Sequence, residues 1–217
     1  MQGEVERRSA GDDAESVYHR RMDGASPDVA VFILAGGKST RMGADKAFVV
    51  LEGRTLLARA LDVARAVTSD VRIVGDPAKF AGFAPVVEDV FRGCGPLGGI
   101  HAALRASRAE LNLMLAVDVP FVSAGLLQFL MAQARRSAAV VTVPRIGGWQ
   151  PLCAVYRREF AEVAEGVLGE GRYRIDALFE IVPTLVISEE ELSVAGFSSA
   201  MFRNLNTREE VERARSE

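Results

Sequence analysis

The feature that most constrains the fold is a series of short, continuous apolar runs that end in glycine or an acidic residue. Residues 29–34 (VAVFIL) lead into two glycines, residues 71–74 into Gly-Asp, and residues 111–117 into Asp118. A run that is apolar at every position is typical of a parallel strand buried on both faces. Segments with helical apolar spacing, such as residues 55–67, lie between these runs. The alternation predicts an open, mostly parallel sheet with helices, whose ligands gather at the carboxyl ends of the strands.

The rest of the chain continues this alternation. We expect further strands at residues 85–87, 138–143, 150–156 and 183–187, and helices at 100–106, 125–136, 159–167 and after 207. Thr207 or Asn206 is the natural N-cap of the last helix. Residues 29–217 are thus predicted to form one Rossmann-like α/β domain. Residues 1–28 are charged throughout and are predicted to be a flexible leader.

Composition excludes several classes of function. A net charge of −3 over 217 residues gives no basic surface for nucleic acid. No run of about 18 apolar residues occurs, so we expect no membrane span. The two cysteines, Cys94 and Cys153, lack the paired spacing of a zinc site or redox dithiol. We therefore expect a cytoplasmic protein that binds small molecules.

The segment after the first strand has the composition of a phosphate-binding loop. Gly36 and Gly37 let the backbone turn sharply and point amide hydrogens into the loop, while Arg41 and Lys46 supply cations for a triphosphate. An ordinary glycine turn with solvated charges is the alternative. Two cations behind a buried strand favour phosphate binding.

Two familiar nucleotide motifs do not fit this loop. A Walker A loop needs a glycine five residues before its Gly-Lys pair, where Phe32 stands. The dinucleotide fingerprint G-x-G-x-x-G fails because Lys38 occupies the position of its second glycine.

The loop resembles the signature of a known family. L-A-G-G-K-S-T-R-M-G-A-D-K is similar to the motif of the molybdenum cofactor guanylyltransferases, and its second glycine favours the guanylyl branch over related cytidylyl and sugar enzymes. Three further segments resemble family motifs in the same order: E-D…G-P-L-x-G at residues 88–99, C-D-x-P-F/Y at 117–121 and N-x-N-T at 204–207. The resemblance covers residues 29–215 and implies a nucleotide-diphospho-sugar transferase-like fold with a mixed central sheet and helices on both faces.

The resemblance also implies roles for individual residues. The catalytic set is Arg41, Lys46 and Asp118, and the nucleotide-binding set is Leu34, Ala35, Gly36, Gly37, Lys46, Gly75, Asp89 and Asp118.

Mg²⁺ is the expected cofactor. A lone carboxylate at the mouth of a buried strand suits Mg²⁺ and phosphates, so we place the metal on Asp118; the alternative is a cap for the turn before Pro120. Asn206 would supply a second oxygen, or would only cap the last helix.

Contacts to the base and to the acceptor are less defined by the sequence. Asp89 can accept from guanine or ribose, but Gly75-Asp76 stands where the family commonly has an asparagine. Residues 150–154 (QPLCA) lie where the family lines its acceptor pocket. Arg172 and Arg174 offer cations for a pterin phosphate, although solvated surface arginines are the default.

The implied reaction is transfer of GMP from GTP to the phosphate of molybdopterin, with release of pyrophosphate. The product would pass to a molybdoenzyme or its chaperone, which implies transient contact with such proteins. Two alternatives stay open: transfer of CMP to molybdopterin or of a nucleotide to another phosphorylated acceptor, and a non-catalytic nucleotide-binding adaptor on the same fold.

Overall fold

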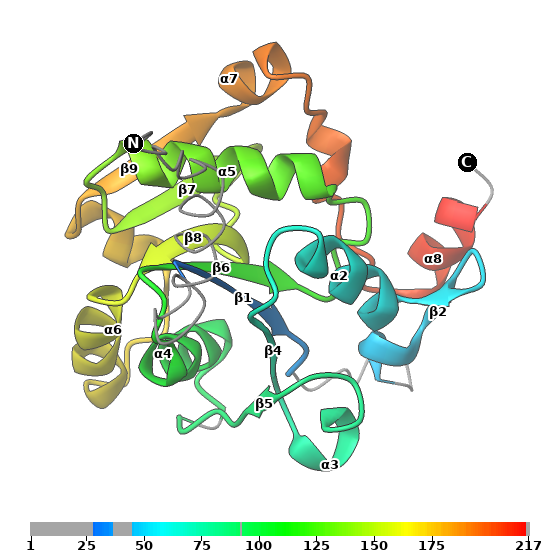
Figure 1. Ribbon diagram of the computed structural model, residues 1–217, viewed down its shortest axis with the longest axis horizontal. Coiled ribbons are helices and arrows are strands. Elements are labelled where there is room, and N and C mark those ends of the chain that lie inside the picture. Colours follow the sequence, from blue (N-terminus) through cyan, green and yellow to red (C-terminus); the bar gives the residue numbers. More distant parts are fainter. Residues whose placement is uncertain (1–27, 37–44, 92, 216–217) are drawn as a thin grey trace, which may run out of the picture.

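The computed structural model describes residues 28–36, 45–91 and 93–215, and within them a seven-stranded sheet forms the centre of the molecule (Figure 1). The predicted leader therefore lies outside the described residues, apart from Asp28. The strand order is β5-β4-β1-β6-β8-β7-β9. These strands are β1 (Val29–Leu34), β4 (Val71–Val74), β5 (Val86–Val87), β6 (Leu111–Ala116), β7 (Val141–Arg145), β8 (Cys153–Arg157) and β9 (Thr184–Ser188).

The sheet is mixed but mostly parallel, as the sequence predicts. Strand β1 pairs in parallel with β4 and with β6, β4 pairs in parallel with β5, and β7 pairs in parallel with β9. Strand β8 runs against both of its neighbours, β6 and β7. The four adjacent strands β5, β4, β1 and β6 therefore end at the same edge of the sheet.

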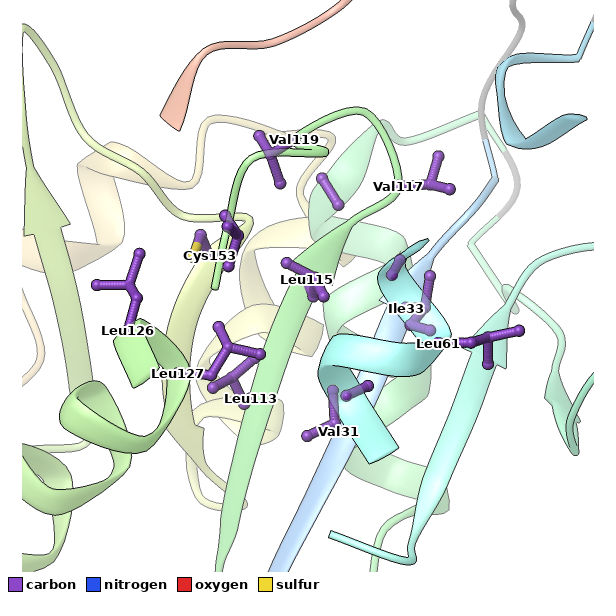
Figure 2. Packing of buried hydrophobic residues seen from close by; sticks show 14 of the residues in the cluster. Val31, Ile33, Leu61, Leu113, Leu115, Val117, Val119, Leu126, Leu127 and Cys153 are labelled. Carbon is purple, nitrogen blue, oxygen red and sulfur yellow. The ribbon is translucent and has the colours of Figure 1, made fainter. Parts of the chain in front are cut away.

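Helices cover both faces of the sheet because β1 is apolar on both. Val31 and Ile33 point into one core with α2 (Leu56–Arg65) and α5 (Ala124–Arg136), and Figure 2 shows this packing around Leu113 and Leu127. Phe32 points into the opposite core. There it meets α4 (Pro96–Ala106) and α6 (Phe160–Gly169), which lie side by side in Figure 1.

Three predicted starts differ from the structure by three residues or more. Helix α4 begins at Pro96 rather than at residue 100, because proline is favoured at N1 and the close packing of Gly98 and Gly99 offsets their low helix propensity. Strand β7 begins at Val141 rather than at 138, because the Ser137 side chain accepts from the Ala139 amide and forms a turn there. Strand β8 begins at residue 153 rather than at 150, after a turn.

Several short elements were not predicted. Strands β2 (Val50–Leu51) and β3 (Arg54–Thr55) form a hairpin, whose turn residues Glu52 and Gly53 have φ of 49° and 78°. The remaining unpredicted elements are α3 (Pro77–Phe80), α7 (Glu189–Val194), and the 3-10 turns η1 (Lys46–Phe48), η2 (Asp176–Glu180) and η3 (Ser199–Phe202).

The predicted C-terminal helix is α8 (Arg208–Arg215), which lies beside β2 in Figure 1. Among the described residues, the helices are too short or too polar to cross a membrane.

We expect Leu113→Ala to lower the free energy of unfolding by about 2–5 kcal/mol, because Leu113 is fully buried in the central strand β6 and truncation leaves a cavity. Urea denaturation measures this loss. The control is Val194→Ala, at a side chain that is 86% exposed, which should change stability by less than about 0.5 kcal/mol. Equal losses in the two variants would contradict this assignment of the core.

Candidate active site

The ends of the four adjacent parallel strands bring the predicted residues to one edge of the sheet. Leu34 is the last residue of β1, Ala35 and Gly36 follow it, Gly75 follows β4, and Asp89 and Asp118 lie two residues beyond β5 and β6. Of the other predicted residues, Gly37 and Arg41 lie outside the described residues. The remaining two, Lys46 and Asn206, come from outside the sheet.

Backbone hydrogen bonds fix this edge. The amides of Ala35 and Gly36 both donate to the Val74 carbonyl at 3.1 Å. The Val117 amide donates to the Leu34 carbonyl at 3.2 Å, which holds the start of the Asp118 turn against β1. The Gly36 amide, which the sequence assigns to phosphate, therefore already has a backbone acceptor.

Lys46 joins three segments that are distant in sequence. Its Nζ donates to Asp118 Oδ2 at 3.0 Å and to Asn206 Oδ1 at 2.5 Å. The Lys46 and Asp118 side chains are 24% and 21% exposed, so the pair lies in a partly desolvated position. Asp118 therefore faces a cation from another segment instead of serving only as a local turn cap. One carboxylate oxygen and one amide oxygen converge on a single positive charge.

The turn η1 sets the position of Lys46. Asp45 is its N-cap, with Oδ1 accepting from the Ala47 amide at 3.2 Å. Oδ2 of Asp45 also accepts from Lys79 Nζ at 2.8 Å, and this carboxylate raises the pKa of Lys79. Ala47 is buried, which leaves its neighbour Lys46 directed toward the sheet edge.

The segment before α8 sets the position of Asn206. The Leu205 amide donates to the Asp118 carbonyl at 2.9 Å, so this segment lies along the Asp118 turn. Thr207 caps the helix, since its Oγ1 accepts from the Glu210 amide at 3.2 Å, whereas the Asn206 side chain turns to Lys46. The amides of Asn206 and Thr207 donate to Glu210 and lower the pKa of that carboxyl group.

Glu210 is a residue of this arrangement that the sequence prediction missed. The available signal was the spacing of Thr207 and Glu210, which is that of a capping box.

Asp89 lies against the first turn of α4. Its Oδ1 accepts from the Phe91 amide at 2.9 Å, and a Cβ added to Gly98 would lie only 2.8 Å from the same oxygen. An anion near a helix N-terminus is favoured by the helix dipole. Asp89 is thus held at the sheet edge by the loop that follows β5.

The Gly75-Asp76 pair has structural roles. The Asp76 side chain caps α3 by accepting from the Ala78 amide at 3.0 Å. A Cβ added to Gly75 would lie 2.8 Å from two carbons of the buried Phe80 ring. This packing gives a physical reason for glycine at the position where the resembled family commonly has asparagine.

The segment predicted to line the acceptor pocket begins beside the Asp118 strand. The Leu152 carbonyl accepts from the Ala116 amide at 2.7 Å. Gln150 donates from its side chain to the Ile146 carbonyl at 3.2 Å, which stabilises the turn between β7 and β8. Cys153 is buried, and burial raises its pKa to about 12, so it behaves as a small apolar residue.

The two arginines assigned to an acceptor phosphate are engaged locally. Arg172 and Arg174 pair with Glu170 and Asp176, each at 2.6 Å, on an exposed segment after α6. The neighbouring Cys94 thiol raises the pKa of the intervening Tyr173 hydroxyl.

Comparison with known proteins identifies the family of this chain. The family model described as MobA-like NTP transferase domain matches residues 31–181. A molybdenum cofactor guanylyltransferase of Desulfosudis oleivorans is 36% identical over 189 residues, covering 86% of this chain and 94% of that protein. One from Syntrophotalea carbinolica is 32% identical and covers 84% of this chain and 89% of that protein.

A solved structure has the same fold. Molybdopterin-guanine dinucleotide biosynthesis protein A from Archaeoglobus fulgidus superposes with a TM-score of 0.76 at 26% identity, covering 86% of this chain and 97% of that one.

We expect Gly75→Ala to lower the free energy of unfolding by about 1–3 kcal/mol, because the new methyl group would displace the buried Phe80 ring. Thermal or urea denaturation measures the loss. The matched control is Gly82→Ala, where a Cβ meets nothing within 4 Å and the change should be neutral or slightly stabilising. A Gly75→Ala variant as stable as the control would show that the Phe80 packing imposes no constraint.

Proposed function

We propose that this chain, which belongs to the family of MobA-like NTP transferase domains, transfers GMP from GTP to the phosphate of molybdopterin and releases pyrophosphate. Relatives that are named as molybdenum cofactor guanylyltransferases support the reaction, since they cover most of this chain. Both cysteines are free thiols, in keeping with a reducing cytoplasm, where we expect the reaction to occur.

The convergence of Lys46, Asp118 and Asn206 is the observation that carries the proposal. These side chains meet at the carboxyl edge of the parallel strands, where ligands of open α/β sheets bind. A triphosphate there would lie against a preformed positive charge, the Lys46 ammonium. Asp89, held on the same edge, is our candidate contact to the guanine or ribose.

The same residues suit a magnesium ion. Asp118 and Asn206 supply two hard oxygen atoms that already converge on one cation. Among the described residues, no group of three or more His, Cys, Asp and Glu side chains could hold a metal by itself. Mg²⁺ retains waters and shares phosphate oxygens, so two protein ligands suffice. When bound, Mg²⁺ would neutralise charge on the phosphates.

The protein's own groups align two anions that repel each other. A phosphate oxygen of molybdopterin attacks the α-phosphorus in line and forms the new P–O bond, while the bond to the bridging oxygen breaks and pyrophosphate takes the electron pair. Lys46 and Arg41 would stabilise the charge that develops on the phosphate oxygens. Asp118 holds the Lys46 ammonium in place, and no covalent enzyme intermediate is required.

We expect Lys46→Ala and Asp118→Asn to lower turnover by about 10²–10³-fold, because each removes a preorganised charge from the site. Pyrophosphate release on mixing GTP, Mg²⁺ and molybdopterin measures it. The control is Asp62→Asn. Asp62 is an exposed residue of α2 that pairs with Arg54 on β3, and this variant should retain wild-type turnover. Near wild-type rates in both site variants would overturn the assignment. An intact protein that releases no pyrophosphate would instead favour a nucleotide-binding adaptor.

We expect GTP with Mg²⁺ to stabilise the protein more than CTP does. Ligand at about 100 times its Kd adds about 2.7 kcal/mol to the unfolding free energy. For a domain of this size the melting temperature rises by roughly 5–10 °C. A thermal-shift series with GTP, CTP, ATP and UTP, with and without EDTA, makes the comparison. A clear preference for CTP would contradict the guanine assignment, and an EDTA-insensitive shift would contradict the role of the metal.

A further inference from the structure

The backbone that presents Asn206 is held by bonds on both sides. The Leu205 side chain is buried, and its amide donates to the Asp118 carbonyl at 2.9 Å. The amides of Asn206 and Thr207 donate to one carboxylate oxygen of Glu210 at 2.5 and 3.0 Å. These three consecutive amides therefore have protein acceptors, which restrict the backbone from which the Asn206 carboxamide projects.

Glu210 does more than cap a helix. In an ordinary capping box, the N3 carboxylate accepts from the N-cap amide and the N-cap hydroxyl accepts from the N3 amide. Thr207 and Glu210 form this pair. The carboxylate of Glu210 also accepts from the preceding residue, Asn206, whose side chain contacts Lys46. Glu210 is thus linked to the candidate site through its hydrogen bond with the Asn206 amide.

Helix α8 is anchored independently of this cap. Val211 and Ala214 are buried in the core that contains α2 and α5. At the other end of the helix, Arg215 Nη2 donates to the Val50 carbonyl at 2.6 Å, on the strand that follows Lys46. Loss of the Glu210 carboxylate should therefore free the first turn of α8 and leave the rest of the helix docked.

We propose that Glu210 is a positioning residue that aims the Asn206 carboxamide at Lys46 and Asp118. Its link to metal binding rests on the proposed function, because the divalent cation is assigned to the same two oxygen ligands. The carboxylate acts through the Asn206 backbone and has no contact of its own with substrate in this role. Removing such a supporting partner typically costs 10–100-fold in metal affinity.

The chain offers a matched control for the cap itself. Ser188 and Glu191 form the same reciprocal capping box on α7, with Ser188 amide to Glu191 Oε2 at 2.7 Å and Glu191 amide to Ser188 Oγ at 3.2 Å. Glu191→Ala therefore removes an equivalent helix cap without touching Asn206. Glu210→Gln keeps a side-chain oxygen that can accept from both amides.

The first measurement is the NMR resonance pair of the Asn206 carboxamide in the full chain, without metal. We expect Glu210→Ala to shift these resonances and lower their order parameter, Glu210→Gln to restore them, and Glu191→Ala to leave them unchanged. The two alanine variants should melt at similar temperatures. An unperturbed Asn206 carboxamide in Glu210→Ala, or an equal perturbation in Glu191→Ala, would refute the positioning role.

The second measurement is Mn²⁺ affinity in the presence of GTP, followed by electron paramagnetic resonance. We expect Glu210→Ala to weaken Mn²⁺ binding by about 10-fold or more, and Glu210→Gln to stay within about 3-fold of wild type. Asp118→Asn separates the two proposals. If Asp118→Asn loses Mn²⁺ binding and Glu210→Ala does not, the link of Glu210 to the metal fails. If Asp118→Asn binds Mn²⁺ as wild type does, the proposed metal site fails. In that case the Asn206 carboxamide resonances still decide the positioning role of Glu210.

Discussion

The partly buried charge of Lys46 is the interaction on which the rest of the site depends. Its ammonium group ties Asp118, at the end of the central strand β6, to Asn206, near the C-terminus of the chain. Because all three side chains are partly shielded from water, their electrostatic interaction is stronger than that of a surface ion pair. Loss of any one of these three side chains would remove a hydrogen-bond partner from another. The contact therefore couples the chemistry of the site to the docking of two peripheral segments.

Those segments form a small unit at one end of the sheet. The hairpin β2-β3 follows Lys46 in the chain, and α8 follows Asn206. The hairpin and α8 are in contact again where Arg215 donates to the Val50 carbonyl. Helix α2 also holds the hairpin, because Arg59 donates to the Leu51 carbonyl at 2.9 Å. Lys46 and Asn206 thus come from one packed unit, while Asp118 and Asp89 come from the segments that follow β6 and β5.

Prediction from the sequence succeeded where burial on both faces leaves a continuous apolar run. The bounds of β1 and β4 agree with the structure at both ends, because glycine follows β4 directly and follows β1 after a single alanine. It failed for the hairpin, whose strands have two residues each and so carry no periodicity, and for α3, which has four residues. Such elements are stabilised by contacts with other segments, which no local pattern records.

The sequence by itself determined the residue types that follow each strand. Because the carboxyl ends of adjacent parallel strands lie at the same edge of the sheet, it also determined which groups lie on the ligand-binding edge. Only the tertiary structure decided how these groups are used. It showed that the Gly36 amide is already bonded to Val74, that Asp76 caps α3, and that Thr207 takes the capping role and leaves Asn206 to Lys46. The reason is that the partners of a strand-end or turn residue come from segments far away in the chain, and spacing along a sequence holds no information about a donor that arrives from elsewhere.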